Sequence, residues 1–352
     1  MTAGIGNRKL RITGRFLLVG ISFGLIYPIL GREIFDPIAL LNGLMIGIIG
    51  SLFLSVSELY LNNPLKRKMK FIPQVLLKTG YYTAFFVLLI LLVYSVNRSI
   101  YNQKGYVEYL KSDEFSSFII HGDFNIIIGY TLLISAAIVF THQMSLKMGQ
   151  GVLLNMIFGK YHHPTKEERV FMFLDLNDST SLAEKLGEVR YNQLINEFFQ
   201  DITDPIVNSN GLIYRYVGDE VVVTWKVDAG IKNINCIRAF FKAIEVINSK
   251  REKYLSKYGI LPQFCAGFHI GPVVIGQVGD VKSQIVFSGH VLYEGGIIEK
   301  SCRTTGQSHL ISEALMKKLT LPRFFIKKYV CDVETESSGN VKLFTTTTLD
   351  KA

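Results

Sequence analysis

Four long apolar segments in the first 142 residues constrain the fold of this chain most. Polar loops separate them, and they cover Phe16–Leu30, Pro37–Leu59, Gly80–Val96 and Ile126–Phe140. About 20 apolar residues in a helix cross the roughly 30 Å hydrocarbon core of a bilayer. The last two segments are short enough to be core helices instead, but four such segments with alternating basic loops favour a four-span α-helical transmembrane bundle. The mean hydropathy of +0.27 agrees.

Basic residues flank these segments and predict their orientation. They gather before the first segment and after the second, at Arg8, Lys9, Arg11, Arg15, Lys66, Arg67, Lys68, Lys70 and Lys78. Positive loops stay on the cytoplasmic side, so a multi-pass protein of the cell (inner) membrane with a cytoplasmic soluble domain is expected. The net charge of +9 is then explained by topology and contact with the lipid bilayer, without nucleic acid.

No small-residue cleavage pattern follows the first segment, so the alternative of a removed signal peptide is disfavoured. None of the four segments carries a charged residue deep inside, which disfavours transport. The four cysteines are far apart and lack zinc-ligand spacing, which predicts reduced, structural thiols.

Residues 143–168 are expected to form a helical linker, because their apolar residues have roughly helical spacing, at Val152, Leu153, Met156 and Ile157. Paired across a dimer, this linker would transmit motion from the membrane to the soluble domain. A passive tether remains equally open.

After the linker, an apolar run delivers a carboxylate to the start of a helix. Val170–Leu174 reads as a strand, Asp175 follows, and a helix starts at Ser179 and Thr180. Unpaired N–H groups at a helix N-terminus bind phosphate, and an adjacent carboxylate binds metal. The alternative is an ordinary turn, in which Asp178 or Ser179 only caps the helix.

The second informative stretch is Gly211–Trp225, GLIYRYVGDEVVVTW. It reads as two strands joined through Gly218 and Asp219, a pair that tolerates tight hairpin geometry. Further along, Ile231–Tyr258 is predicted to be one long helix, and Gln263–Val278 a strand pair turned at Gly271–Pro272.

Within that strand pair, His269 is expected to be a packed or capping residue. Leu321–Leu349 is predicted to form strands around the turn Glu336–Asn340. Together these elements give the soluble half an α/β fold of ferredoxin-like β-α-β-β-α-β arrangement.

The ordered segments FLDLNDSTSLAEKLG, YRYVGDE and AGFHIGPVVIGQVG resemble the class III nucleotide cyclase domain of bacterial adenylate cyclases. The resemblance covers roughly Glu168 to Leu315. It implies a cyclase-like domain at 169–320, and C-terminal strands at 321–352 complete the soluble domain. The apolar segments predict a transmembrane domain at 1–142, followed by the linker at 143–168.

The resemblance also implies a site. Asp175 and Asp219 match the two metal-binding aspartates of the family, and the carbonyl of Leu176 matches its backbone ligand. Two ions, magnesium or manganese, would serve the reaction of ATP to cyclic AMP and pyrophosphate. Nucleotide binding is implied for Leu176, Asn177, Asp178, Ser179, Thr180 and Arg215.

Several positions depart from the family pattern. Asp178 stands where many relatives have glycine, and Arg215 replaces the lysine that reads adenine, which leaves ATP and GTP both open. In SGHVLYEGGIIEK, Tyr293 and Ile297 occupy the positions of the asparagine that orients the ribose and the arginine that stabilises the reacting phosphate. Val286 replaces a base-reading residue. Losing one electrostatic donor typically costs about a hundredfold to a thousandfold in rate.

Four hypotheses follow. The chain forms a heterodimer with another cyclase domain that supplies the missing groups, or it is an inactive pseudocyclase acting as a nucleotide-binding regulator or membrane sensor. Alternatively it is an active homodimer that uses other residues, with Tyr293 and Arg303 as candidates. In the fourth it is a structural membrane protein with a vestigial soluble domain, in which Asp175 and Asp219 are only turn residues.

Overall fold

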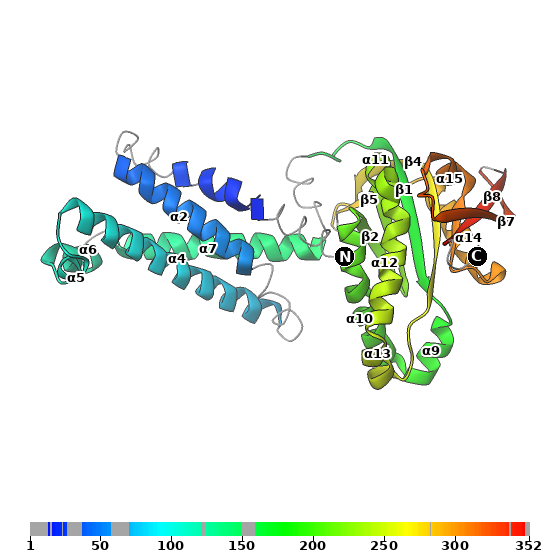
Figure 1. Ribbon diagram of the computed structural model, residues 1–352, viewed down its shortest axis with the longest axis horizontal. Helices are drawn as coiled ribbons and strands as arrows, with labels where there is room; N and C mark the ends of the chain where they lie inside the picture. The colour runs from blue at the N-terminus through cyan, green and yellow to red at the C-terminus, as the bar shows by residue number, and fades with distance from the viewer. Residues whose placement is uncertain are drawn as a thin grey trace. The chain divides into compact units, whose positions relative to one another are not determined.

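The computed structural model describes residues 13–14, 16–22, 24–26, 37–57, 70–120, 124–148, 159–281, 283–337 and 339–348. The chain divides into two compact units, Met1–Lys147 and Met148–Ala352 (Figure 1). Most of the predicted basic clusters and the apolar residues of the linker lie outside the described residues.

The N-terminal unit is helical throughout its described part. Its labelled helices are α2 (Pro37–Val56), α4 (Phe71–Tyr101), α5 (Tyr106–Leu110), α6 (Asp113–Ile120) and α7 (Phe124–Met148). Two helices, Phe71–Tyr101 and Phe124–Ser145, are long and apolar enough to cross a membrane, and shorter apolar helices cover Phe16–Ile26 and Leu40–Val56. Two of the four expected spans therefore meet the length test.

Two loop predictions in this unit are wrong. The basic loop after the second apolar segment is predicted to extend to Lys78, but Phe71–Lys78 forms the first turns of α4. Pro73 is tolerated there because the first N–H groups of a helix lack partners within the helix. The predicted loop Asn97–Phe124 contains the end of α4 and the short helices α5 and α6. Helix propensity predicts the conformation of such short stretches poorly, because packing against neighbouring helices determines whether they become helical.

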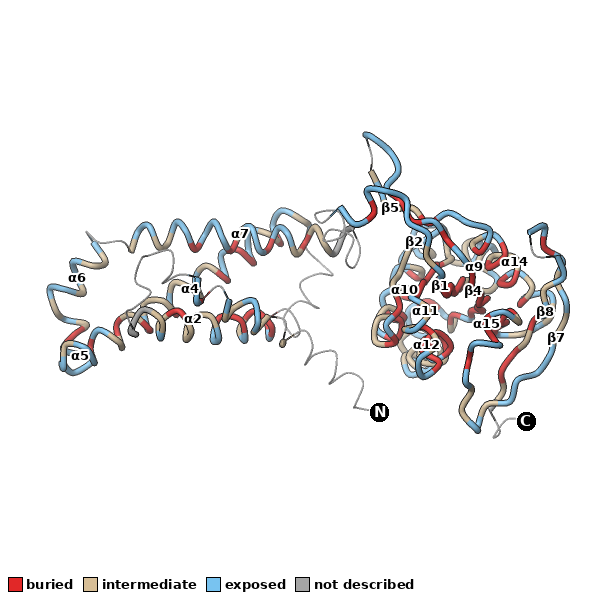
Figure 2. The backbone as a smooth tube through the Cα atoms, turned by 90° about the horizontal axis from the view of Figure 1, so that it is seen from above, coloured by how far each residue is buried: buried red, intermediate tan, exposed pale blue. Residues whose placement is uncertain are grey.

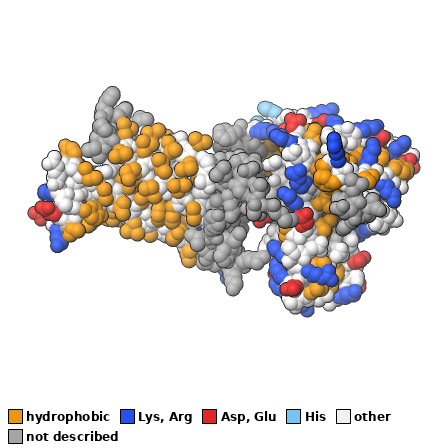
Figure 3. All heavy atoms as spheres, in the orientation of Figure 1, with side chains coloured by type: hydrophobic (Ala, Val, Ile, Leu, Met, Phe, Trp, Pro, Cys, Tyr) orange, Lys and Arg blue, Asp and Glu red, His pale blue; other side chains and the backbone are white. Residues whose placement is uncertain are grey.

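Glycines bring the first helix and α2 into backbone contact. A Cβ atom at Gly24 would lie 2.2 Å from the carbonyl oxygen of Gly43, and one at Gly47 would lie 2.3 Å from that of Gly20. Both helices thus present a small-xxx-small spacing at their crossing, as membrane helix pairs often do. Large apolar side chains cover the outer surface of the unit (Figure 3), among them Leu88, Ile126 and Leu133, each at least 66% exposed.

The C-terminal unit is built on one mixed sheet. Its strands are β1 (Thr165–Leu176), β2 (Leu212–Val217), β3 (Glu220–Lys226), β4 (Phe264–Val278), β5 (Gln284–Ser288), β6 (His309–Ser312), β7 (Phe325–Thr335) and β8 (Gly339–Thr348). The order is β2-β3-β1-β4-β6-β8-β7, with β5 paired to β4. Among the described strands, only β4 and β6 pair in parallel. The predicted hairpin at Gly218–Asp219 and the C-terminal strands are confirmed.

Helices cover both faces of the sheet (Figures 1 and 2). They are α9 (Ser179–Leu186), α10 (Glu188–Asn208), α11 (Val227–Ile231), α12 (Asn235–Ser249), α13 (Arg251–Tyr258), α14 (His290–Thr305) and α15 (Glu313–Lys318). α10 and α12 bury Phe198 and Phe240 against the Val170, Met172 and Leu174 face of β1. α14 contributes Val291 to the opposite core, with Phe171 and Phe173. β1 is therefore buried on both faces.

The predicted single helix Ile231–Tyr258 is wrong. α11 ends at Ile231, a 3-10 turn covers Lys232–Ile234, and α12 and α13 follow. Asn233 and Ile234 have positive φ angles of 54° and 50°, which break the helix. This conformation is unfavourable for a β-branched residue, but Ile234 is buried in the core in exchange.

The predicted turn at Gly271–Pro272 is also wrong, because β4 runs unbroken from Phe264 to Val278. β1 pairs along its first edge, with Glu168 opposite Pro272. Along its other edge, β4 pairs with β6 as far as Phe268 and with β5 from Val274 onward. Pro272 lies within this gap in the ladder, where a residue without an N–H is tolerated.

Candidate active site

Asp175 lies at the end of β1, where the strand leaves the core. Its strand neighbours Leu174 and Leu176 are fully buried, whereas Asp175 itself is partly exposed. Its carboxylate Oδ1 accepts the Leu176 N–H at 3.0 Å. The strand therefore fixes the backbone of this residue and leaves the second oxygen, Oδ2, for other partners.

The β2–β3 hairpin brings Asp219 to the same place. β3 pairs antiparallel with β1, with Val221 opposite Leu174, so the turn before β3 lies beside the residue after Leu174. Gly218 has a φ angle of 63°, which a tight turn requires and glycine adopts freely. The structure thus brings together the two carboxylates that the motifs predicted as a pair.

Two further acidic residues, Glu220 and Glu299, join this pair. The pKa of Asp175 is raised to about 7 by burial first, and then by the charges of Asp219 and Glu299. Burial and the charge of Glu299 raise the pKa of Glu220, and burial raises that of Glu299. The charges of these carboxylates act on one another and create a negative potential that favours cations.

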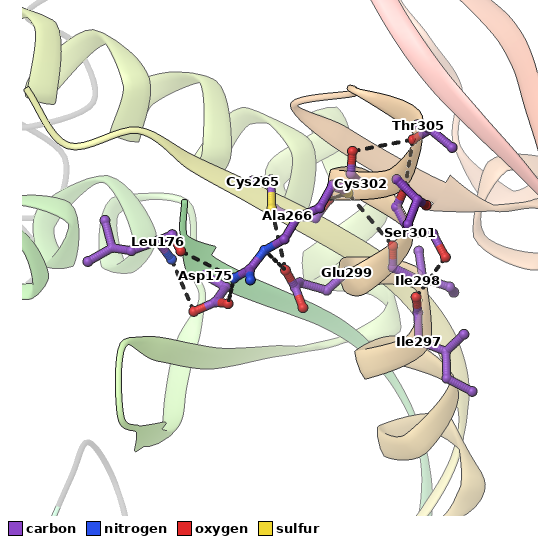
Figure 4. Close-up of polar contacts among 12 residues, drawn as sticks. Asp175, Leu176, Cys265, Ala266, Ile297, Ile298, Glu299, Ser301, Cys302 and Thr305 are labelled. Atoms are coloured by element: carbon purple, nitrogen blue, oxygen red, sulfur yellow. Dashed lines mark hydrogen bonds and ion pairs between the residues drawn. The ribbon is translucent and has the colours of Figure 1, made fainter. Parts of the chain in front are cut away.

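One cation from the chain itself contacts this cluster. Arg303, in the last turn of α14, donates from Nη2 to Asp175 Oδ2 and, at 3.2 Å, to the carbonyl of Leu176 (Figure 4). Its Nε lies 4.0 Å from Glu299 Oε1, one helical turn earlier. The sequence named Arg303 only as a candidate in an active homodimer, and the structure places it on the carboxylate of its own chain.

The predicted phosphate-binding amides lie between β1 and α9. The amide of Asn177 donates to the carbonyl of Gln263 at 2.9 Å, so it is engaged in the sheet. The amides of Asp178, Ser179 and Thr180 precede the first helical bond of α9, from Leu182 N–H to Asp178 O. A helix N-terminus leaves such groups available to an anion.

Asp178 does not cap α9 through its side chain. It has a left-handed conformation with a φ angle of 55°, which glycine adopts most easily and aspartate tolerates. The geometry explains why glycine suits this position in the family pattern.

A cavity of about 660 Å³ opens beside Asp219. α10 and the hairpin line it, and the rings of Phe199 and Tyr216 pack against each other with centroids 4.5 Å apart and a tilt of 37° between their planes. Tyr191, which the sequence had not singled out for the site, also lines it. Burial raises the pKa of Tyr191, as do the charges of Asp219 and Asp175, so its phenol lies near both carboxylates.

The remaining predicted residues lie on β2, α14 and β4. Arg215 is exposed on β2, with its guanidinium 5.4 Å from the ring centroid of Tyr214. Tyr293 and Ile297 are one turn apart on α14, and Tyr293 is 56% exposed. His269 is buried, with its ring nitrogens 2.7 Å from Glu294 Oε2 and 2.8 Å from Ser312 Oγ, as a packed residue.

The donors at the end of β1 suit a hard divalent cation. The side chains of Asp175 and Asp219 and the carbonyl of Leu176 are all oxygen ligands, which magnesium and manganese prefer. Asp219 Oδ2 and Asn177 Oδ1 are buried without a hydrogen-bond partner among the described residues. Within the same residues, no three His, Cys, Asp or Glu side chains are grouped to hold an ion. Such a site needs further ligands from a substrate or water.

Comparison with known proteins supports the cyclase resemblance, although no protein-family model matches the chain. The chain is 33% identical to adenylate cyclase 2 of Rhizobium meliloti (strain 1021) over 210 residues, which are 60% of this chain and 58% of that protein. It is 26% identical to adenylate cyclase of Anabaena cylindrica over 161 residues, 44% of this chain and 31% of that one. The chain thus spans less than two thirds of either relative.

Among solved structures, a bacterial light-regulated adenylyl cyclase matches with a TM-score of 0.53 and 19% identity, over 62% of this chain and 64% of that one. At this identity the match concerns the fold. Together with the sequence relatives it confirms the predicted resemblance: the chain is similar in sequence to adenylate cyclases and in fold to a bacterial adenylyl cyclase.

Proposed function

We propose that this chain is a membrane-anchored, adenylate-cyclase-like protein of cyclic-nucleotide signalling. It binds a nucleoside triphosphate with two magnesium or manganese ions, and a partner cyclase chain supplies the missing asparagine and arginine. The observation that carries the proposal is the convergence of Asp175 and Asp219 beside the Leu176 carbonyl, at the N-terminus of α9.

In the proposed reaction the 3′-oxygen of the nucleotide attacks its own α-phosphorus. A new phosphorus–oxygen bond forms, the bond to the β-phosphate bridge breaks, and the hydroxyl proton passes to solvent. The divalent ions, when bound, activate the attacking oxygen and neutralise the leaving pyrophosphate. Asp175, Leu176 O and Asp219 hold them, and the amides of Asp178 to Thr180 orient the phosphates.

α14 supports the need for a partner. In the family pattern its exposed side supplies the asparagine and arginine to a site shared between two cyclase domains. Here Tyr293 and Ile297 are one turn apart on this helix, and an isoleucine neither donates a hydrogen bond nor carries charge. A second copy of this chain therefore brings no arginine at that position, whereas a different cyclase domain does.

The same observation favours a second candidate function. Without a complementing partner, the chain would bind nucleotide and metal without turnover, as a pseudocyclase that regulates signalling. The relatives' names favour ATP as the nucleotide in either case. Arg215 differs from the expected lysine in its donor geometry, so GTP is tested alongside.

Anchoring to the lipid bilayer is part of the proposal. The two long helices of the N-terminal unit leave most of their apolar windows unburied, at 22% and 17% buried. In a soluble protein, exposed apolar helix surfaces of this kind would form contiguous patches, and such patches favour association with other molecules. The glycine crossing of the first helix with α2 supports packing of these two helices within a membrane bundle. The four apolar segments and the basic residues that flank them support a four-span, multi-pass arrangement in the inner membrane, with the soluble domain in the cytoplasm.

The test is mass-spectrometric detection of cyclic AMP and cyclic GMP from purified full-length protein given ATP or GTP with manganese. Asp175→Asn is the control. Product that disappears in the control would establish a working homodimer and contradict the need for a partner. If no product forms, adding an Asn- and Arg-bearing cyclase domain separates the heterodimer, which gains activity, from the pseudocyclase, which does not.

A further inference from the structure

Arg303 contacts the same atoms that the proposed function assigns to a metal ion. Its guanidinium donates to Asp175 Oδ2 and to the Leu176 carbonyl oxygen (Figure 4). A charge-assisted pair of this kind is among the stronger hydrogen bonds in proteins. Arg303 therefore acts as an internal counter-cation for the acidic cluster.

The fold holds the helix of Arg303 close to the end of β1. A Cβ atom at Gly267 of β4 would lie 2.4 Å from the backbone nitrogen of Glu299, and one at Gly295 would lie 2.1 Å from the ring of Phe173. These two close approaches press α14 onto β4 and β1. Arg303 lies one turn beyond Glu299 and so reaches Asp175.

Glu299 supports the same placement. Its side chain is 3% exposed, and Oε1 accepts the Cys265 thiol proton at 3.4 Å while lying 4.0 Å from Arg303 Nε. Cys265 is the β4 partner of Asp175 in the sheet register. Arg303 is thus held between two carboxylates, one on its own helix and one on β1.

A divalent ion and the guanidinium compete for this position. Both need the lone pairs of Asp175 Oδ2 and Leu176 O, and two cations close together repel each other. The side chain of Arg303 is 47% exposed, so it has solvent into which to withdraw. Metal binding at Asp175 would then include the loss of the Arg303 contacts.

We propose that Arg303 is a built-in competitor for the divalent ion, and that its withdrawal from Asp175 and Leu176 sets the metal affinity of the site. The inference rests on the proposed function, because it assumes that Asp175 and Leu176 ligate the metal. Arg303 is then a residue that weakens metal binding, in contrast to the transition-state arginine of the family pattern.

The test measures manganese binding directly, without turnover. Full-length protein in detergent is titrated with manganese alone, and the free ion is followed by electron paramagnetic resonance. Arg303→Gln is expected to lower the dissociation constant about fivefold, because the competing ion pair is partly exposed. Asp175→Asn should abolish the binding.

Lys300→Gln is the matched control. Lys300 is exposed on the same helix and acts on Glu299 and Glu220 through its charge, so its removal changes the local potential in the same direction. Its charge is not among those that shift the pKa of Asp175. If Lys300→Gln tightens binding as much as Arg303→Gln, general electrostatics explains the effect and the inference is overturned.

The remaining outcomes separate the inference from the proposed function. Equal or weaker manganese binding by Arg303→Gln overturns the inference and leaves the metal site standing. Binding by Arg303→Gln alone, without binding by the wild type, supports the inference in its strongest form. No binding by either protein overturns both.

Discussion

Arg303 and Asp175 form an ion pair across 128 residues of sequence, which links the last turn of α14 to the end of β1. Asp175 lies near Asp219 and Glu299 as well, so the guanidinium opposes a repulsion that the fold creates.

The first prediction concerns stability without metal. Arg303→Gln should lower the free energy of unfolding of the C-terminal unit by about 1 kcal/mol in the presence of a chelator, since the ion pair is partly exposed. Trp225, the single tryptophan of the chain, is 1% exposed in the core of this unit, so its fluorescence in a urea titration reports on this unit. The double variant with Asp175→Asn should lose less than the sum of the single effects. Additive effects would contradict the pairing.

The second prediction concerns ligand-induced stabilisation. Manganese with ATP should raise the melting temperature of the C-terminal unit by mass action, and Asp175→Asn should remove this rise. Tyr216→Phe is the control and should keep the rise in melting temperature, because it retains the ring that packs against Phe199. An equal rise in wild type and Asp175→Asn would mean that Asp175 and Asp219 are turn residues only.

The third prediction restores the family residues on α14. The double substitution Tyr293→Asn and Ile297→Arg should raise cyclic nucleotide production by the homodimer about a hundredfold or more, because it adds donors where charge develops. The two positions are one turn apart, Tyr293 is exposed and Ile297 is half-buried, and neither is among the buried residues of α14, so the change should leave the core in place. The measurement is product formation by mass spectrometry, with Asp175→Asn added to the double variant as control. An unchanged rate would place the defect elsewhere in the site.

The fourth prediction compares adjacent glycines of α14. A Cβ atom at Gly295 would lie 2.1 Å from Cε2 of the buried Phe173, whereas nothing lies within 4 Å at Gly296. Gly295→Ala should therefore destabilise the unit by about 1–3 kcal/mol through overpacking. Gly296→Ala should be neutral or stabilise by up to about 1 kcal/mol through helix propensity. Urea titrations of both variants, followed by Trp225 fluorescence, decide the matter, and similar values would show that α14 does not press on β1.

The fifth prediction concerns pH. His309 is buried beside Phe240 and Phe241, and its Nε2 accepts the Thr346 N–H at 3.2 Å. Burial lowers the pKa of His309 to about 4. In the unfolded chain His309 binds a proton as pH falls through about 6.5, whereas in the folded chain it binds one only near pH 4. The neutral histidine's contribution to stability is therefore complete above pH 6.5 and is lost as pH falls toward 4.

Asp175 acts in the opposite sense. Its pKa is raised to about 7, so its protonated form favours folding below its unfolded pKa of 3.8, and this contribution is lost as pH rises through 7. Comparison with a variant isolates the histidine. The destabilisation caused by His309→Gln should grow between pH 4 and 6.5, by at most about 1.4 kcal/mol per pH unit, and then level off. A pH-independent difference would show that His309 does not titrate with folding.

Local features were predictable from the sequence where a short stretch specifies its own conformation. An apolar run followed by Asp175 identifies the end of a buried strand, and Gly218–Asp219 identifies a tight turn between β-rich segments. Since the motif order matched a known family, the pairing of the two aspartates could be expected. The packed role of His269 was also predicted correctly.

Other features depend on contacts with residues that lie far away in the sequence. Pro272 looked like a turn, yet β1 pairs along the whole segment, so the ladder overrides the local signal. Asn233 and Ile234 break a helix that charge and composition favoured, because burial of Ile234 outweighs its unfavourable φ angle.

The sequence by itself therefore determined the apolar N-terminal segments, the likeness to cyclase domains and the two aspartates of the candidate site, because these rest on composition, motif order and local spacing. Only the tertiary structure decided that Arg303 meets Asp175. No local preference relates two residues 128 positions apart, and the contact exists because Gly267 and Gly295 allow α14 to lie against the backbone of β4 and the ring of Phe173 on β1.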